Sequence, residues 1–277
     1  MDSLKTYKNK TVLLIITLLC FLLYGNSLNN GYNLDDGWAF QNKGKTDLLT
    51  GLQNSFSSTY VSIGDVKYGY RPVSSAVFEI EQAVFGQNPF VSHFINVLLF
   101  VVICYSIFIW LNKHMNVGWH LALLITVIFL FLPIHSEVVN SVKNRDELLS
   151  SFFGVWFLIW SWKYYKKGTA VSLVIGAFFF AVSILSKTSS LPLLAVVPIG
   201  LWITSSANIK RLAVLFIVPL LVIFTTRSAT GSVDELKETN RSYSILENPL
   251  YGEHTSLDKA KVCIKAFGFY LTGIIST

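Results

Sequence analysis

The chain has 277 residues, of which 52% are hydrophobic and only 14% charged, and its mean hydropathy is +0.53. This composition excludes an ordinary soluble domain and is typical of a protein that crosses a membrane several times. The net charge of +6 does not indicate a nucleic-acid partner, because that function needs a basic patch on a soluble face. The odd number of cysteines, three, argues against a disulfide framework.

Apolar segments predict eight membrane-spanning helices. Several of them reach the roughly 20 residues needed to cross a bilayer only when their flanks are counted. The expected spans are residues 11–24, 91–111, 117–133, 148–162, 169–186, 191–204, 212–226 and 262–275. The first is interpreted as an uncleaved helix, because no Ala-x-Ala-like cleavage site follows it and further spans do. The predicted fold class is an all-α polytopic membrane protein.

Basic and acidic residues fall on opposite sides of these spans if the spans alternate in direction. Lys113, Lys166 and Arg211 lie in connections on the side of the N-terminus, whereas every acid from Asp35 to Asp258 lies on the other side. By the positive-inside rule, the N-terminus is cytoplasmic and the acidic loops are extracytoplasmic. The longest of these outer loops are residues 26–90 and 227–261, and any chemistry is expected on that side.

The first outer loop carries two adjacent carboxylates, Asp35 and Asp36, shortly after the first span. Like charges repel each other, so this pair needs solvent, a cation partner or a functional role. A solvated turn is the alternative, because Asn, Gly and Asp favour turns. Later in the loop, residues 72–85 predict a helix that lies in the membrane interface, with Pro72 at its start, Gly86 at its end and apolar residues at helical spacing.

The second outer loop, residues 134–147, is the other polar stretch. His135 and Glu137 are two residues apart, which does not match the spacing of a metal-binding pair on one helix face. Under the 3.6-residue period, Glu137, Asn140, Ser141 and Asn144 share a face. This polar stripe predicts the wall of a cavity, and a solvated surface helix is the alternative.

Several motifs resemble the membrane half of the TMTC family. In chain order they are Tyr24-Gly25-Asn26-Ser27-Leu28 followed by Asp35-Asp36; Arg71-Pro72 running to Phe85-Gly86, Asn88-Pro89-Phe90, His93 and Asn96; and Leu132-Pro133-Ile134-His135-Ser136-Glu137 with Arg145-Asp146-Glu147-Leu148. The family comprises O-mannosyltransferases of the GT-C superfamily that usually carry tetratricopeptide repeats after the membrane domain. Thr188 departs from the family pattern, which often has Ser-Lys-Glu where this chain has Ser-Lys-Thr.

The resemblance implies a GT-C-type bundle of about eight transmembrane helices, with interfacial helices in a long first extracytoplasmic loop. It implies a single membrane domain over residues 1–277, truncated at its C-terminus. The implied activity is that of an inverting glycosyltransferase, which moves a mannose-like sugar from a polyprenyl phosphate to an extracytoplasmic acceptor, either a protein hydroxyl or a glycan. Membrane lipid and other membrane subunits are further implied partners, and nucleic acid is not. No cofactor is expected besides the lipid-linked donor, and dependence on a divalent metal is left open.

The implied mechanism needs one base to deprotonate the acceptor hydroxyl and cations to hold the leaving phosphate. Asp35 matches the first acid of the family's pair and is the expected base, with Asp36 orienting it or the acceptor. The expected substrate-binding residues are Arg71, His135, Glu137, Lys143, Arg145 and Lys187. Arg71 leads among the cations because a guanidinium binds two phosphate oxygens at once, although an Arg before Pro can instead cap the helix. A polyprenyl tail also needs an apolar path to the acids, expected between the interfacial helix and the second outer loop.

The alternative functions are a non-catalytic scaffold subunit and a lipid or solute transporter. Transporters place ionisable groups near the middle of their spans and interrupt matching helices with Gly or Pro. Here the span interiors are almost free of charge and the ionisable groups gather on one side, which favours the enzyme. Pro198 and Pro219 interrupt two late spans, so transport stays open as the alternative.

Overall fold

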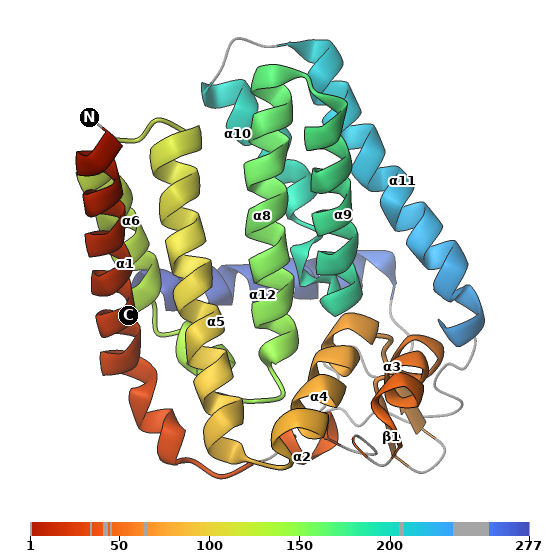
Figure 1. Cartoon of the computed structure of the whole chain (residues 1–277). Coiled ribbons are helices and arrows are strands. Elements are labelled where there is room, and N and C mark those ends of the chain that lie inside the picture. The colour runs from red at the N-terminus through yellow and green to blue at the C-terminus, as the bar shows by residue number, and fades with distance from the viewer. Residues whose placement is uncertain are drawn as a thin grey trace.

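The computed structural model describes residues 2–33, 35–40, 44, 46–63, 66–204, 208–234 and 255–276. Most of them form a bundle of helices that run along a common direction (Figure 1). The bundle helices are α1 (Asp2–Tyr24), α5 (Pro89–Ile109), α6 (Trp119–Phe131), α8 (Arg145–Lys167), α9 (Ala170–Ser186), α10 (Leu193–Thr204) and α11 (Ile209–Asp234). In the same view α12 (Ser256–Ser276) crosses behind the bundle.

Shorter elements gather at the end of the bundle that lies opposite the N-terminus (Figure 1). They are η1 (Gly25–Asn29), α2 (Asp36–Ala39), α3 (Leu48–Ser57), β1 (Val61–Ile63), β2 (Val66–Tyr68), α4 (Pro72–Phe85), α7 (His135–Asn140) and η3 (Thr188–Ser190). β1 and β2 pair antiparallel, with Val61 opposite Tyr68, and form a small hairpin, whereas the other elements in the described part of the chain are helices. At the other end, one π-helical turn, η2 (Trp110–His114), follows α5.

Two hydrophobic clusters hold the bundle together. In the first, Ile16 and Cys20 of α1 pack with Phe100 of α5 and with residues of α6. The second joins α8 to α9, α10 and α11 around Trp162. Trp110 contacts both clusters, and its ring meets that of Trp162 edge-on at 5.6 Å between centroids. Packing in the described part of the bundle is therefore continuous from α1 to α11.

The outer surface of the bundle is apolar. Leu22 of α1 is 77% exposed and Phe224 of α11 is 70% exposed. Exposed apolar patches of this kind are disfavoured in water but match the hydrocarbon of a bilayer. In the described residues, three segments are long and apolar enough to cross a membrane: Asn9–Asn29, Pro89–His114 and Ile209–Thr226. These features indicate a membrane protein, as the sequence predicts.

All eight predicted spans fall on helices, but their lengths and directions differ. The segments Trp119–Phe131, Ala170–Ser186 and Thr188–Trp202 are shorter apolar helices. The predicted span at 262–275 lies on α12, which crosses the bundle in Figure 1 rather than running along it. α11 continues to Asp234 and so enters the predicted last outer loop, of which residues 235–254 lie outside the described part. The count of eight spans remains a prediction.

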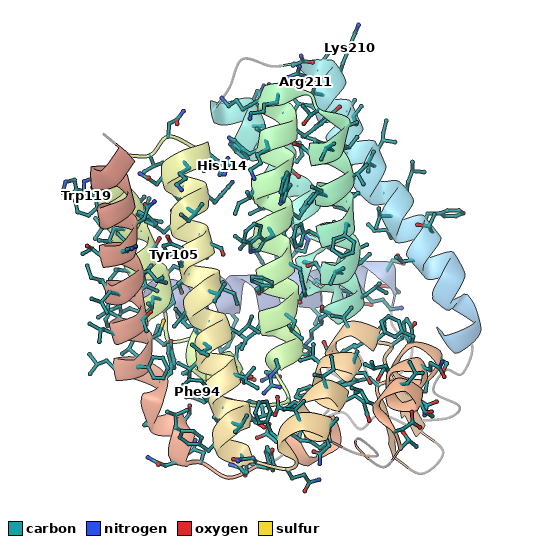
Figure 2. All side chains as sticks on the ribbon, viewed as in Figure 1. Phe94, Tyr105, His114, Trp119, Lys210 and Arg211 are labelled. Carbon is teal, nitrogen blue, oxygen red and sulfur yellow. The ribbon has the colours of Figure 1, made fainter. Side chains whose placement is uncertain are left out.

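Basic side chains mark the end of the bundle that carries the N-terminus. His114, Lys210 and Arg211 lie at this end, whereas Phe94 lies toward the opposite one (Figure 2). Arg211 Nη1 donates to the carbonyl oxygens of Tyr165 at 2.6 Å and Lys166 at 3.1 Å, which lie in the last turn of α8. A cation is favourable there because carbonyl groups at a helix C-terminus carry partial negative charge. The described acids of the first two outer loops lie at the other end, so the predicted separation of charges is present in this part of the chain, and its orientation across the membrane stays a prediction.

The predicted interfacial helix is confirmed as a helix, with the expected bounds of residues 72–85. Its faces are inverted relative to those of a helix on a soluble protein. Glu79 and Glu81 are 2% and 4% exposed, whereas Ile80, Val84 and Phe85 are 46%, 62% and 54% exposed. An outward apolar face suits a helix that meets lipid, so this pattern supports the interfacial location.

Candidate active site

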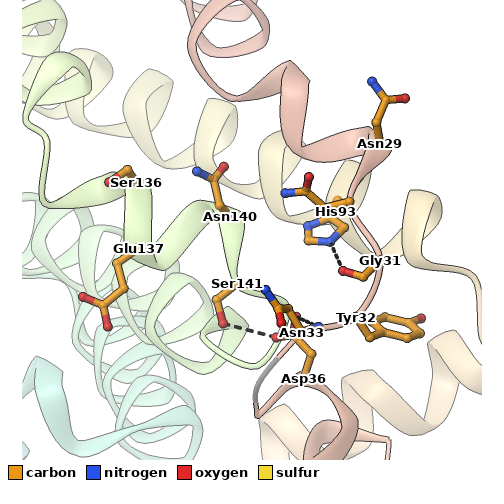
Figure 3. A pocket seen from close by; sticks show the side chains of 11 residues that line it. Asn29, Gly31, Tyr32, Asn33, Asp36, His93, Ser136, Glu137, Asn140 and Ser141 are labelled. Atoms are coloured by element: carbon orange, nitrogen blue, oxygen red, sulfur yellow. Dashed lines mark hydrogen bonds between the residues drawn. The ribbon is translucent and has the colours of Figure 1, made fainter.

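A polar pocket of about 540 Å³ lies where the first outer loop meets α5 and the second outer loop (Figure 3). Its lining residues are Asn29, Asn30, Gly31, Tyr32, Asn33, Asp36, His93, Ser136, Glu137, Asn140 and Ser141. The predicted polar stripe is confirmed for Glu137, Asn140 and Ser141. Asn144 does not line the pocket and instead donates from Nδ2 to the Glu137 carbonyl at 3.5 Å.

Local hydrogen bonds and one proline position the first and second outer loops beside the pocket. Tyr24 Oη donates to the Leu130 carbonyl at 3.2 Å, which fixes the end of α1 against α6. Ser27 Oγ then donates to the Tyr24 carbonyl at 2.7 Å and turns the chain into η1. On the other side, Pro133 ends α6, because the residue before a proline is pushed out of the helical region. Ser136 Oγ donates back to the Pro133 carbonyl at 2.7 Å, and α7 begins there.

The two adjacent acids have different surroundings. Asp36 is 2% exposed and accepts hydrogen bonds from the backbone N–H of Asn33 at 3.1 Å and of Lys143 at 2.8 Å, and from Ser141 Oγ at 3.2 Å. It therefore ties the first outer loop to the second. The Asp35 side chain is 65% exposed, and its Oδ2 lies 4.0 Å from Lys143 Nζ. Asp35 is next to the pocket in sequence but does not line it.

A buried arginine network lies behind the pocket. Arg145, at the start of α8, is fully buried and forms an ion pair with Glu81 of α4. Its Nε donates to Asn96 Oδ1 at 2.7 Å and its Nη2 to the Ser92 carbonyl at 2.8 Å. The guanidinium carbon also lies 4.7 Å from the centre of the Phe78 ring. Arg145 therefore directs these donors at protein groups, and it does not line the pocket.

This network reaches the pocket lining by two routes. Asn96 Nδ2 donates to the Ser141 carbonyl at 2.9 Å, in the loop that Asp36 holds. Ser92 Oγ hydrogen-bonds Glu81 and lies 2.9 Å from Tyr32 Oη. Burial raises the pKa of Tyr32, so this hydroxyl keeps its proton at neutral pH. Arg145 therefore supports both walls of the pocket.

A second ionic cluster lies at the neighbouring start of α8 and end of α9. Asp146 is fully buried, pairs with Arg71 and lies 3.2 Å from Lys187 Nζ through Oδ1. Lys187 Nζ also lies 2.8 Å from Glu147 Oε1. The Arg71 and Lys187 side chains are 27% and 19% exposed, so a ligand can reach both. The structure thus brings two of the predicted cations together, around a carboxylate that sequence reasoning did not assign to the site.

The remaining predicted cation, His135, lies elsewhere. Its ring packs against those of Phe129 and Phe100, with centroids at 4.4 and 5.2 Å, and it does not line the pocket. Burial lowers the pKa of His135, so the ring is neutral at neutral pH. The pocket is also not bounded by α4, since no residue of that helix lines it. It therefore differs in place from the apolar path expected between the interfacial helix and the second outer loop.

The sequence analysis did not assign His93, Tyr32, Glu81 or Asn96 to the site. Asn96 and His93 belong to motifs that carry the family resemblance, and this was the signal available for them. Among the described residues, no group of three or more His, Cys, Asp or Glu side chains is placed to hold a metal ion.

No family model matches the sequence, and no solved structure matches it. Several curated proteins do match the sequence. The chain is 31% identical over 150 residues to protein O-mannosyl-transferase TMTC3 of Homo sapiens, which is 53% of this chain and 16% of that protein. It is 26% identical to TMTC1 of Homo sapiens over 47% of this chain and 15% of the relative.

A third match is to protein O-mannosyl-transferase tmtc2 of Xenopus laevis, with 27% identity over 66% of this chain and 23% of the relative. The chain is TMTC-like in sequence. The matched part spans less than a quarter of the length of each of these relatives. This similarity supports the predicted resemblance to TMTC proteins. The activity of a whole TMTC protein is a proposal for this chain.

Proposed function

We propose that this chain is the membrane part of an inverting glycosyltransferase that transfers a mannose-like sugar from a polyprenyl phosphate to an extracytoplasmic acceptor, preferentially a protein hydroxyl. The observation that carries the proposal is the polar pocket next to Asp35 and Asp36, at the end of the bundle away from the basic connections. The names of the TMTC relatives, which are protein O-mannosyl-transferases, support the reaction class.

The location suits a lipid-linked donor. A polyprenyl tail stays in hydrocarbon, so its phosphate and the sugar carbon bonded to it lie at the membrane interface. The site elements gather at one end of the bundle, and α4 turns Ile80, Val84 and Phe85 outward there. In the proposed orientation the bundle forms a GT-C-type fold of about eight spans, with a cytoplasmic N-terminus and the pocket on the extracytoplasmic side.

In the proposed reaction, the acceptor oxygen attacks the anomeric carbon from the face opposite the phosphate. The bond from that carbon to the phosphate oxygen breaks, and its electron pair leaves with the phosphate. Asp35 takes the acceptor proton, because its side chain is exposed, whereas Asp36 is held by three hydrogen bonds and positions the loop. A single base is sufficient, since a phosphate can leave as an anion without being protonated.

Cations are needed to hold the leaving phosphate. Arg71 and Lys187 are the proposed phosphate ligands, because both are partly exposed and lie on the same carboxylate, Asp146. That carboxylate fixes the two cations in place before the donor binds, so little reorganisation is required. Lys143 Nζ lies 4.0 Å from Asp35 Oδ2 and is placed to orient this carboxylate.

The test is transfer of radiolabelled mannose from a synthetic polyprenyl phosphate to an acceptor protein, with the full-length protein in proteoliposomes. Asp35→Asn keeps the size of the side chain but removes the base, so transfer should fall about 10²- to 10⁴-fold while the donor still binds. Arg71→Lys keeps the charge but loses the two-pronged contact, so it should weaken donor binding.

Asp47→Asn is the matched control. Asp47 lies in the same loop and caps α3 by accepting from the Thr50 backbone N–H at 3.0 Å, a role that Asn also performs. Its variant should transfer at the wild-type rate. Undiminished transfer by Asp35→Asn would reject this residue as the base. Absence of transfer by the folded wild-type protein with any lipid-linked donor would favour the scaffold or transporter function.

A further inference from the structure

At the outer end of the bundle, the acidic side chains of the pocket lie apart from the basic side chains Arg71 and Lys187. Among the residues that the structure describes, the pocket lining contains two carboxylates, Asp36 and Glu137, several amides and hydroxyls, and no Lys or Arg. Arg71 and Lys187 instead meet at Asp146 and do not line the pocket. An anion in the pocket would thus face two carboxylates without a balancing side chain from the lining.

The pocket also has buried hydrogen-bond acceptors with no partner in the described part of the chain. They are His93 Nδ1 and Asn140 Oδ1. His93 is 1% exposed, and its Nε2 lies 3.5 Å from the Gly31 carbonyl, which can only accept. The proton therefore belongs on Nε2, and Nδ1 is left as an acceptor. Buried acceptors without partners are costly, so a ligand that donates hydrogen bonds is favoured here.

Ligand chemistry follows from these two observations. An ionised phosphate group offers acceptors and negative charge, and it mismatches a lining of acceptors and carboxylates. Sugar hydroxyls donate hydrogen bonds and carry no charge, so they match it. The volume of about 540 Å³ lies within the range of small-molecule sites, roughly 300–1,000 Å³.

We propose that this pocket binds the uncharged, hydroxyl-rich ring of a hexose and excludes its phosphate, which stays outside at Arg71 and Lys187. The choice of a mannose-type ring rests on the proposed function. So does the phosphate at Arg71 and Lys187, whereas the preference of the pocket for an uncharged hydrogen-bond donor follows from the charges and unpaired acceptors of the described residues. Asn140 and His93 are the specificity-determining residues for the ring, since each supplies a buried acceptor to a hydroxyl.

The experiment is saturation-transfer-difference NMR on the full-length protein in lipid nanodiscs. The probes are methyl α-mannopyranoside, which is neutral, and inorganic phosphate as the competitor. The glycoside should receive saturation from the protein, and phosphate at equal concentration should not displace it. In Asn140→Ala, the lost acceptor should weaken glycoside binding about three- to tenfold, the effect of one hydrogen bond.

Asn144→Ala is the matched control, because Asn144 has the same side chain in the same loop but does not line the pocket. Its glycoside affinity should equal that of the wild type. If Asn140→Ala fails to fold, Glu137→Gln replaces it: Glu137 is exposed, and loss of its charge removes a strong acceptor from the lining. The glycoside should then bind more weakly as well.

Displacement of the glycoside by phosphate, absence of glycoside binding, or equal binding by the wild type and the folded pocket variants would overturn the inference. These results are separable from failure of the proposed function. Glycoside binding that depends on Asn140 without any transfer would refute the transferase and leave the pocket assignment standing. Transfer without glycoside binding in the pocket would refute the pocket assignment and leave the transferase function standing.

Discussion

Replacing Arg145 with Met should strongly destabilise the protein. Arg145 is fully buried, and its partner Glu81 is only 4% exposed. Removing the guanidinium leaves the buried Glu81 carboxyl group without its ion-pair partner. The substitution also removes the hydrogen-bond donors of Asn96 Oδ1 and the Ser92 carbonyl. Breaking one side of a buried ion pair typically costs about 3–5 kcal/mol, and complete burial means that solvent screening does not reduce this value.

The double variant Arg145→Met with Glu81→Met should recover most of that loss. Replacing both partners of a buried pair by apolar residues of similar volume is often close to neutral. Two acceptors, Asn96 Oδ1 and the Ser92 carbonyl, still lack their donor, at about 1 kcal/mol each. The expected free energy of unfolding is thus about 2 kcal/mol below that of the wild type, although two residues have changed.

The assay is reversible unfolding by titration with sodium dodecyl sulfate in mixed micelles, followed by tryptophan fluorescence. Arg211→Met is the control, because Arg211 is partly exposed and donates to the last carbonyls of α8, a contact worth about 0.3–1 kcal/mol. An Arg145→Met protein that unfolds within about 1 kcal/mol of the wild type would refute the claim that this ion pair holds the pocket walls together.

Three further predictions test the fold and its orientation. Cys20 of α1 and Cys104 of α5 are both buried in the first hydrophobic cluster, so a membrane-permeant oxidant should join them in a disulfide, and absence of this bond would contradict the packing of these helices. Burial lowers the pKa of His135 below its ordinary value of 6.5, so the unfolded chain binds its proton more readily and stability should fall as the pH drops below 6.5. His135→Phe should reduce this fall in thermal midpoint, and an unchanged pH dependence would show that the ring does not cause it. In intact cells, an impermeant thiol reagent should label a cysteine placed at Gly37 and not one at Asn112, and the opposite pattern would reverse the proposed orientation.

The sequence predicted the features that depend on neighbouring residues. Pro72 and Gly86 bound a helix because proline is tolerated in the first helical turn and glycine adopts the positive φ of 64° that ends it. The polar stripe of the second outer loop was also correct for Glu137 and Asn140, because side chains at i and i+3 share a helix face. Helix-ending residues and the spacing of side chains along a helix depend only on nearby sequence, so they can be predicted without knowledge of the fold.

Long-range pairing could not be predicted in the same way. Arg145 and Glu81 are 64 residues apart, and nothing in either local pattern names the other as its partner. Charged residues are normally assigned to solvent, but α4 turns its apolar face outward and buries its acids in the protein. Asp35 and Asp36 are adjacent and chemically identical, so only the hydrogen bonds of the second outer loop separate the open carboxylate from the buried one.

The most direct test of the central claim is photo-crosslinking with a polyprenyl phosphate mannose that carries a small diazirine on the sugar. The full-length protein in proteoliposomes would be irradiated, digested and mapped by mass spectrometry, with excess unmodified donor as the competitor. The proposed site predicts competed crosslinks on peptides that contain residues 29–36 and 136–141, the two walls of the pocket. Competed crosslinks confined to α10 or α11, with none in these two segments, would contradict it.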